Sequence, residues 1–535
     1  MIYLFVVNKM NKKILCILIA FILFLTCFSG CSDDEEIYLS CPITEMPQHF
    51  DPQIAKSQGE KIVAVNTFDG LFKLDENGEP QKCAVKDYKV STDGLVYTFY
   101  LREDMKYFIS KSAKSFIESK ETEIEAKVTA HDFAFGITRA ILPETNAPDY
   151  GLVSVIKNAE NVHNGLETAS SLGIRVVNDY TLEITLERKT DDFLFALSQP
   201  VSFPCDEEFF NLTSGRYGLD RKYTISNGAF YLSDIAEDES VRFSKNTEYN
   251  GSFVATPTSV RLYVNSDQKD IAKKINGKNY SVAFLSSTEA KESLNKKVNK
   301  VYLQNTTTAL VFNLSKETMQ NINLRTGLVE SINFTSVTET PAKSLVPSAF
   351  DLSTDKNIVL ATNVDSAREK LKTAFNELKT DTLTVNVLCT EEYEDIAKGI
   401  VSCWQANIGV ELNGAITVVE QKDFDSAIKN GSYDTAIYPL SIDSNRSVDF
   451  LGMFKSENAL NIFRYASEEY DRMYNEFKVA PTFNKAIDCE TYLLKNAVIM
   501  PIINENTIFS TAKDVSGVYF AVDSSNIYFY KGQSK

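Results

Sequence analysis

The sequence predicts a mixed α/β protein with an N-terminal export signal, and three observations lead to this prediction. A chain of 535 residues corresponds to about three domains or lobes at roughly 150 residues each. The second half alternates strand-like and helix-like patterns, while the half before residue 300 is richer in strand-like patterns. The N-terminus combines lysines with a short apolar run.

The composition is that of a soluble globular protein. Hydrophobic residues make up 44% and charged residues 24%, which is ordinary for packed domains. Disorder, collagen and coiled coil are therefore excluded as descriptions of the whole chain.

The alternation of elements is clearest in the second half. Apolar residues recur there at helical spacing between short apolar or β-branched runs. The expected elements are, in order, a helix over 365–378, a strand over 383–388, a helix over 393–407, strands over 410–412 and 416–419, a helix over 423–429 and a strand over 434–438. Strands that alternate with helices favour a largely parallel sheet with helices on its faces.

The charge balance argues against nucleic acid as a partner. Lysine and arginine total 55, aspartate and glutamate total 72, and the formal net charge is −17. An anionic surface repels a phosphate backbone. We therefore expect a partner of another class.

Residues that hold metals or catalyse reactions form no recognisable pattern. The three histidines are His49, His131 and His163, and no two of them stand at the spacing of a zinc site. No glycine-rich phosphate loop, nucleophile elbow or pair of motif carboxylates occurs in the sequence. We expect no metal, no cofactor and no enzymatic activity.

The N-terminus predicts a lipoprotein signal peptide over residues 1–30. Lysines form a positive start, an apolar run over 14–28 follows, and small residues precede Cys31, although the usual leucine of such a lipobox is Phe28 here. An uncleaved membrane anchor is the alternative, but the run is shorter than the ~20 residues that a spanning helix needs. Cleavage would leave a lipidated Cys31 at the head of an acidic linker over 31–36. It would remove three lysines and no acids, so the net charge would change from −17 to −20.

Cysteine usage predicts neither a disulfide scaffold nor a redox motif. Nine cysteines occur, and the six that follow the lipidated one show no CxxC pairing. We expect most of them to be buried small hydrophobic residues. The six are Cys41, Cys83, Cys205, Cys389, Cys403 and Cys489.

Several short motifs stand in the order and spacing of one protein family. They are Phe50-Asp51-Pro52, Phe68-Asp69-Gly70-Leu71, Ser91-Thr92-Asp93-Gly94-Leu95-Val96-Tyr97-Thr98-Phe99-Tyr100-Leu101-Arg102, Val128-Thr129-Ala130-His131-Asp132-Phe133 and Ser226-Asn227-Gly228-Ala229-Phe230. With these motifs the chain resembles the extracellular solute-binding proteins of family 5. These are the oligopeptide- and dipeptide-binding lipoproteins of peptide-type ABC importers. The similarity runs from Phe50 to about Tyr530.

The resemblance implies a periplasmic-binding-protein-like two-lobe fold of type II, cluster C, with an extra domain inserted in the first lobe. The implied partition assigns 37–66, 206–300 and the C-terminal return 501–535 to lobe I. It assigns 67–205 to the extra domain and 301–500 to lobe II.

The resemblance also implies a function. A lipid-anchored receptor on the outer face of the cell membrane would capture peptides between hinged lobes and deliver them to the permease subunits of an ABC importer. Such a receptor is expected to be a monomer without a cofactor. Other ligands of the same scaffold are alternatives to a peptide, namely a nickel chelate, an oligosaccharide, an opine or a signalling peptide. A lipoprotein that no longer takes part in transport is a further alternative.

Asp443 is expected to bind the α-ammonium of the ligand, and Ser441, two positions earlier, is also expected to contact the ligand. When Phe450-Leu451 anchors the register, Asp443 matches a family aspartate that pairs with this amine through a charge-assisted hydrogen bond. The chain departs from the family nearby, because Pro439-Leu440 replaces Gly-Trp and Arg446-Ser447 replaces Asp-Pro. The alternative is an aspartate on a solvent-exposed loop.

Tyr150, Ser57 and Gln58 are the other expected ligand contacts. In the family, an aromatic residue matched by Tyr150 leans over the bound peptide; the alternative is a packing tyrosine. Ser57 and Gln58 follow Phe50-Asp51-Pro52 in a loop that borders the ligand in the family. The alternative for both is an ordinary polar loop.

Four acidic residues, Glu391, Glu392, Glu394 and Asp395, stand at the start of a predicted helix. The preferred interpretation is that they match the helix dipole. The functional alternative is that they face the ligand, so that the site disfavours acidic peptides. Trp404 lies at helical spacing with apolar residues of the same helix and is expected in the core.

Overall fold

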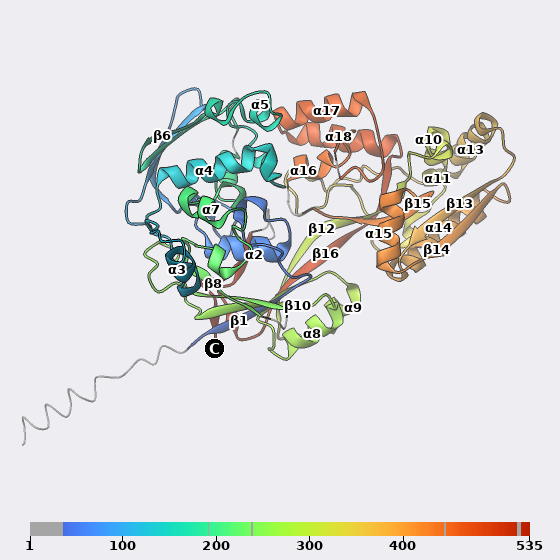
Figure 1. Cartoon of the computed structure of the whole chain (residues 1–535). Helices are drawn as coiled ribbons and strands as arrows, with labels where there is room; N and C mark the ends of the chain where they lie inside the picture. Colours follow the sequence, from blue (N-terminus) through green and yellow to red (C-terminus); the bar gives the residue numbers. More distant parts are fainter. Residues whose placement is uncertain (1–35, 191, 237–238, 443–445, 459, 522–525) are drawn as a thin grey trace, which may run out of the picture.

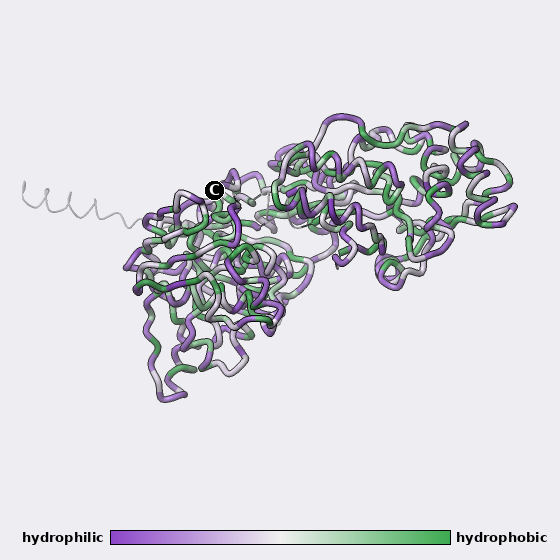
Figure 2. Tube along the Cα trace, turned by 90° about the horizontal axis from the view of Figure 1, so that it is seen from above, coloured by the Kyte–Doolittle hydropathy of each residue, from purple (hydrophilic) through white to green (hydrophobic). Residues whose placement is uncertain are grey.

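The computed structural model describes residues 36–190, 192–236, 239–442, 446–458, 460–521 and 526–535. The signal peptide with Cys31 and the position of Asp443 therefore lie outside the described residues. The described part forms two bodies joined by long strands (Figure 1). Along the traced chain, hydrophobic stretches alternate with hydrophilic ones in both bodies (Figure 2). No described helix is both long enough and apolar enough to cross a membrane.

Lobe I contains a four-stranded sheet in the order β1-β10-β9-β8. The strands β8 (Phe230–Ala236), β9 (Ser240–Lys245) and β10 (Ser259–Val264) are antiparallel neighbours, and β1 (Tyr38–Ile43) runs parallel to β10. Side chains alternate between the two faces of a strand. Leu39, Cys41 and Ile43 of β1 accordingly lie in the core, while Tyr38 is exposed. The helix α2 (Gln58–Thr67) packs against β8.

The segment 67–205, expected to form an extra domain, contains a second four-stranded sheet in the order β4-β5-β7-β6. All neighbours in it are antiparallel. The strands are β4 (Val85–Val90), β5 (Val96–Leu101), β6 (Ile174–Asn178) and β7 (Thr181–Thr185). The helix α4 (Ala130–Ile141) covers the sheet, and its Phe133 and Ile137 share one core with Phe99 of β5. This core is distinct from that of lobe I.

Two long strands connect lobe I with lobe II. They are β12 (Asn299–Phe312) and β16 (Ile499–Thr511), antiparallel neighbours in a six-stranded sheet of order β11-β16-β12-β15-β13-β14. At one end β16 pairs with β11 (Val282–Leu285) of lobe I, and at the other end β12 pairs with β15 (Thr435–Leu440) of lobe II. Figure 1 shows both long strands between the two bodies.

The pairing of β12 with β16 is irregular near its middle. The register shifts between Gln304 and Thr306 and again between Thr308 and Ala309. Such irregularities bend a strand and increase its twist. Residues 304–309 and the facing residues 501–506 of β16 are called the hinge region below.

Lobe II packs helices against the rest of this sheet. The strands β13 (Leu383–Cys389) and β14 (Leu412–Val418) run parallel to each other, and β13 also runs parallel to β15. The main helices are α11 (Ile322–Glu330), α13 (Val364–Leu378), α14 (Glu394–Asn407), α15 (Gln421–Asn430), α16 (Ser447–Gly452), α17 (Glu468–Val479) and α18 (Phe483–Lys495). The core position expected for Trp404 is confirmed, because the residue is fully buried and its Nε1 donates to Leu328 O across 3.1 Å.

Three expected strands of lobe II differ from the structure. The strands expected over 410–412 and 416–419 are one strand, β14, which runs through Gly414. A Cβ atom on Gly414 would lie 2.8 Å from Val401 Cγ1 of α14, so this glycine permits a close approach of helix and strand rather than a turn. The strand expected over 434–438 extends to Leu440, because β12 pairs with it along its whole length.

Shorter elements complete the fold. The helices are α3 (Lys111–Glu118), α5 (Ala159–His163), α6 (Phe193–Ala196), α7 (Glu207–Thr213), α8 (Gln268–Asn276), α9 (Thr288–Ser293), α10 (Glu317–Gln320) and α12 (Phe334–Val337). The strands are β2 (Phe72–Leu74), β3 (Pro80–Lys82), β17 (Val515–Ser516), β18 (Tyr519–Ala521), β19 (Asn526–Tyr528) and β20 (Gln533–Ser534). The six cysteines of the described part are free thiols, and their expected burial is confirmed.

One buried ion pair joins the second sheet to lobe I. Arg139 of α4 lies 2.7 Å from Asp51 and donates across 2.8 Å to Gln53 Oε1. The Gln53 amide in turn donates to Phe203 O across 2.8 Å. Arg139 and Asp51 are only 8% and 4% exposed. Loss of one partner would leave the other charge buried and unpaired, which is costly.

We expect Arg139→Met to lower the free energy of unfolding by roughly 3–5 kcal/mol, because Asp51 would keep a buried charge without its partner. Urea titration followed by circular dichroism measures the change. The matched control is Arg175→Met, which removes the exposed Arg175–Glu183 ion pair of 2.8 Å and should cost no more than about 1 kcal/mol. Equal losses in the two variants would contradict the role given to the Arg139–Asp51 pair.

Candidate ligand-binding site between the lobes

The loop expected to bind the amine begins where β15 ends. Ser441 follows Leu440 directly and is exposed, and Ile442 packs partly against the core of lobe II. Asp443 comes next in the sequence and lies outside the described residues. The loop therefore starts at the carboxyl end of a sheet strand, where open α/β sheets bind their ligands.

The second half of β15 has a neighbouring strand on one side only. The strand β12 pairs with β15 from Thr435 to Leu440. On the other side β13 pairs with Thr435 and Ala436, and no further strand of the described part of the chain continues beyond them. An edge of this kind leaves main-chain donors and acceptors available to an extended ligand.

Ser57 and Gln58 lie at the start of α2. Ser57 Oγ accepts a hydrogen bond from Glu60 N across 3.3 Å, while the Glu60 carboxylate accepts from the N–H groups of Ser57 and Lys56, both across 2.9 Å. Burial alone would raise the pKa of Glu60, but these N–H groups hold it below its ordinary value. Ser57 is thus the cap of a helix, and Gln58 is a half-buried first helical residue.

Tyr150 lies close to α2. An ion pair of 3.1 Å between Lys61 of α2 and Asp149 brings the two segments together. The Tyr150 ring stacks on His163 with centroids 3.8 Å apart and packs partly against the core of the second sheet. Its hydroxyl is buried without a hydrogen-bond partner among the described residues. Burial, and after it the charge of Glu160, raises the pKa of Tyr150 to about 12, so the hydroxyl stays neutral and can donate.

Polar side chains from both lobes meet at the hinge. Glu505 of β16 accepts hydrogen bonds from Tyr393 Oη, across 3.2 Å, and from Thr308 Oγ1. Lys291 of α9 donates across 2.8 Å to Asn506 O. Burial raises the pKa of Tyr393 and lowers that of Lys291. Neither Glu505 nor Lys291 stands in a recognisable sequence motif, because their partners come from distant segments.

The acidic residues at the start of α14 fall into two sets. Glu394 and Asp395 form ion pairs with Lys398 of the same helix, at 3.0 and 3.4 Å, which agrees with the helix-dipole interpretation. Glu391 and Glu392 are exposed. Partial desolvation, together with the charge of Glu505, raises the pKa of Glu392. The charge of Glu392 therefore interacts with that of Glu505 at the hinge, whereas the charges of Glu394 and Asp395 are paired with Lys398 within α14.

One ion pair links the second sheet's domain to lobe II. An Arg446 guanidinium nitrogen lies 2.7 Å from an Asp192 carboxylate oxygen. Arg446 directly precedes α16 of lobe II, and Asp192 directly precedes α6. The sequence identified Arg446 only as a departure from the family, since its partner is 254 positions away. The pair bridges the two bodies, and Arg446 stands three positions after Asp443 in the sequence.

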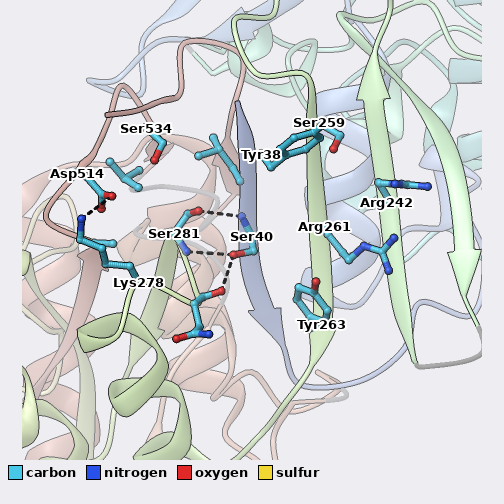
Figure 3. Close-up of a pocket in the computed structure, with 14 residues that line it drawn as sticks. Tyr38, Ser40, Arg242, Ser259, Arg261, Tyr263, Lys278, Ser281, Asp514 and Ser534 are labelled. Carbon is cyan, nitrogen blue, oxygen red and sulfur yellow. Dashed lines mark hydrogen bonds and ion pairs between the residues drawn. The ribbon is translucent and has the colours of Figure 1, made fainter. Parts of the chain in front are cut away.

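A separate hollow of about 360 Å³ lies on the lobe I sheet (Figure 3). Ser40 and Ser281 exchange hydrogen bonds there, each main-chain N–H donating to the other hydroxyl, and Lys278 forms an ion pair of 2.8 Å with Asp514. All residues around the hollow come from β1, β9, β10 and segments that adjoin them. The hollow therefore belongs to lobe I alone and does not include the residues expected to bind a ligand.

Taken separately, the segments described above offer hydrogen bonds, an aromatic ring and charge. These groups are the open edge of β15, the Tyr150 hydroxyl and the carboxylates of Glu392 and Glu505. Within the described ranges, no group of three or more His, Cys, Asp or Glu residues is arranged to hold a metal ion. This chemistry suits a polar, extended ligand.

Comparison with known proteins identifies the family of the chain. The family model of bacterial extracellular solute-binding proteins, family 5 Middle, matches residues 79–461. The dipeptide-binding protein DppE of Bacillus subtilis is 23% identical over 499 residues, which cover 88% of this chain and 87% of that protein. The periplasmic oligopeptide-binding protein OppA of Haemophilus influenzae is 22% identical over 499 residues, which cover 89% of each.

A solved structure shows the same fold. Listeria monocytogenes OppA bound to peptide matches with a TM-score of 0.72 at 24% identity, covering 94% of this chain and 99% of that chain. The expected two-lobe α/β fold of type II is therefore confirmed. Because the family model spans most of the sequence, the chain belongs to the bacterial extracellular solute-binding proteins of family 5.

Proposed function

We propose that this protein is a lipid-anchored receptor outside the cell membrane that encloses a peptide between its two lobes and delivers it to an ABC importer. The observation that carries the proposal is the open edge of β15, which leads directly into the loop of Asp443. A row of main-chain groups followed by a carboxylate suits a peptide, because a peptide has a repeating main chain and an α-ammonium.

Two further observations support a peptide receptor. DppE and OppA, which match nearly the whole chain, are named as dipeptide- and oligopeptide-binding proteins. The strands β12 and β16 connect the lobes and pair irregularly near their middle, and hinge rotation about such a connection can enclose a ligand. In this proposal the protein binds without catalysis and acts as a monomer.

Native mass spectrometry of the purified protein with a defined pool of tri- to pentapeptides tests the proposal. We expect one peptide per chain, and enrichment of neutral or cationic peptides over acidic ones because of Glu391 and Glu392. Binding of no pool member would overturn the peptide assignment. The tightest member of the pool, called the selected peptide below, serves as the probe in the following experiments.

We expect Asp443→Asn to weaken binding of the selected peptide about thirty- to several-thousand-fold, because truncation of one partner of a buried charge pair costs roughly 2–5 kcal/mol. Calorimetry with the free and the N-acetylated peptide measures this. Acetylation should weaken binding to the wild type and have little further effect on the variant. Asp395→Asn removes an exposed charge of the same lobe and should change little. If acetylation of the peptide does not lower its affinity for the wild type, Asp443 does not bind the amine.

We expect the selected peptide to compact the molecule, with the Arg446–Asp192 pair favouring the compact form. Asp192→Ala should enlarge the radius of gyration without peptide and weaken binding up to about fivefold, since a partly exposed ion pair contributes about 0–1 kcal/mol. Small-angle scattering with and without peptide measures the change. The control Glu476→Gln breaks the Arg472–Glu476 pair inside α17. An unchanged radius on peptide binding to the wild type would refute closure by hinge rotation.

We expect Cys31→Ala to release the protein from membranes or to leave it unprocessed, because stable anchoring requires more than one acyl chain and Cys31 is the expected attachment point. Labelling of cells with a clickable fatty acid should mark the wild type and not the variant. The control Cys41→Ala changes a buried thiol and should leave labelling intact. Absence of label on the wild type would contradict lipidation.

A further inference from the structure

Residues 342–351 of lobe II, which the structure describes without a gap and which are called the strap below, lie between α12 and α13 and contain no helix or strand. The strap is nevertheless packed into the lobe, because Leu345 and Val346 are at most 1% exposed and Phe350 is 3% exposed. Main-chain N–H and C=O groups that are buried in this way need partners elsewhere in the fold. The partners of the strap therefore show which parts of the molecule it connects.

The first half of the strap is bonded to the lobe II side of the hinge region. Ala342 N donates to Ile502 O of β16 across 2.8 Å. Leu345 O accepts from Thr307 Oγ1 of β12, also across 2.8 Å. The Glu490 carboxylate of α18, only 1% exposed, accepts from the N–H of Leu345. The strap is thereby fixed to both hinge strands and to a helix of lobe II.

The second half of the strap is bonded to the lobe I side of the hinge region. Ala349 N donates to Gln304 O across 3.1 Å, and Ser348 Oγ donates to Gln304 Oε1 across 2.5 Å. The register of β12 against β16 shifts between Gln304 and Thr306. The strap therefore has bonds on both sides of this shift, since Thr307 lies beyond it. A bend at the shift would separate the two sets of bonds unless the strap moves as well.

The end of the strap holds the start of α16. The rings of Phe350 and Phe450 meet edge to face, with centroids 5.2 Å apart. The Asp351 carboxylate accepts a hydrogen bond from Ser447 N, and Asp351 O accepts one from Ser447 Oγ. Ser447 is the first residue of α16 and is fully buried, so its N–H has no partner within the helix and depends on Asp351. Arg446, the residue before it, forms the ion pair between the two bodies.

We infer that the strap couples the hinge region to α16, and that Asp351 is a positioning residue for the Arg446–Asp192 pair. A bend between Gln304 and Thr306 reaches the strap through its bonds to β12, and the strap passes the displacement to α16 through Asp351. Arg446 then moves with the start of α16, toward Asp192 or away from it. As a part of peptide capture this coupling rests on the proposed function, because closure of the lobes is what it would serve there.

The distance between two spin labels, one on each body, tests the inference without any peptide. Glu167→Cys and Asn484→Cys place the labels at exposed positions of the segment 67–205 and of α18. The six thiols that the structure describes are buried and do not compete for the label. Double electron–electron resonance then gives the ratio of the compact form to the extended form in each variant.

We expect Asp351→Ala to lower this ratio up to about fivefold, because a partly exposed ion pair such as Arg446–Asp192 contributes at most that much. Asp351→Asn keeps an oxygen that can accept from Ser447 N and should leave the ratio close to that of the wild type. The control Asp355→Ala removes an exposed carboxylate four positions further along the same segment and should change nothing. Thermal unfolding checks that each variant folds.

A double variant separates positioning from a general loss of stability. If Asp351 acts through Arg446, Asp351→Ala should have no further effect once Asp192→Ala has removed the partner. An undiminished effect in that background, or an unchanged ratio in Asp351→Ala alone, overturns the inference. Ser348→Ala removes the side-chain bond to Gln304 at the hinge end of the strap and should lower the ratio as well. An unchanged ratio in this variant would overturn the coupling to the hinge region.

The result does not depend on the proposed function, because no peptide enters the experiment. If the peptide pool fails to bind while the ratio changes as expected, the coupling stands and the peptide assignment fails. If a peptide binds while Asp351→Ala leaves the ratio unchanged, the receptor stands and the coupling is overturned.

Discussion

The pairing of β12 with β16 is the constraint on which the rest of the structure depends. Its lobe I end places Ile508 and Phe509 in cores of that lobe, and its other end places Ile499 and Met500 in the core of lobe II. The same hydrogen-bonded ribbon therefore belongs to the packing of both bodies. A paired ribbon keeps its length because its hydrogen bonds fix the register, but it can twist where that register is irregular. In the proposed receptor, this ribbon favours rotation of the lobes relative to each other over a change in their separation.

Much of lobe II could be predicted from the sequence because its signals are local. The helix over Val364–Leu378 and the strand over Leu383–Cys389 follow directly from apolar periodicity. The strands expected over 410–412 and 416–419 are one strand, because Gly414 between them permits close packing of α14 and does not form a turn. The order of the six-stranded sheet could not be predicted. The strand β16 pairs with β12 across almost two hundred positions of chain, and hydrophobic periodicity does not indicate which strands pair.

The candidate site was predictable only in part, for the same reason. Its position after β15 followed from the register of Phe450-Leu451, a motif local to the loop. The spacing of Ser57 and Glu60 carried the signature of a capping box, so the helix start was present in the sequence although the segment was interpreted as a loop. The Arg446–Asp192 contact joins two charges among many in the chain. Complementary charge alone does not identify such partners before the fold brings them together.

The burial of all six described thiols has a chemical consequence for a protein located outside the cytoplasm. Burial raises the pKa of Cys205 to about 12 and that of Cys389 to about 11. Oxidation and disulfide exchange proceed through the thiolate, so these side chains are nearly inert at neutral pH. In the proposed location the described part of the chain needs no oxidative folding catalyst, and its thiols offer oxidants no ready target. A single cysteine introduced on the surface would be the one reactive thiol among the described residues, and it could carry a reporter dye without any prior removal of native cysteines.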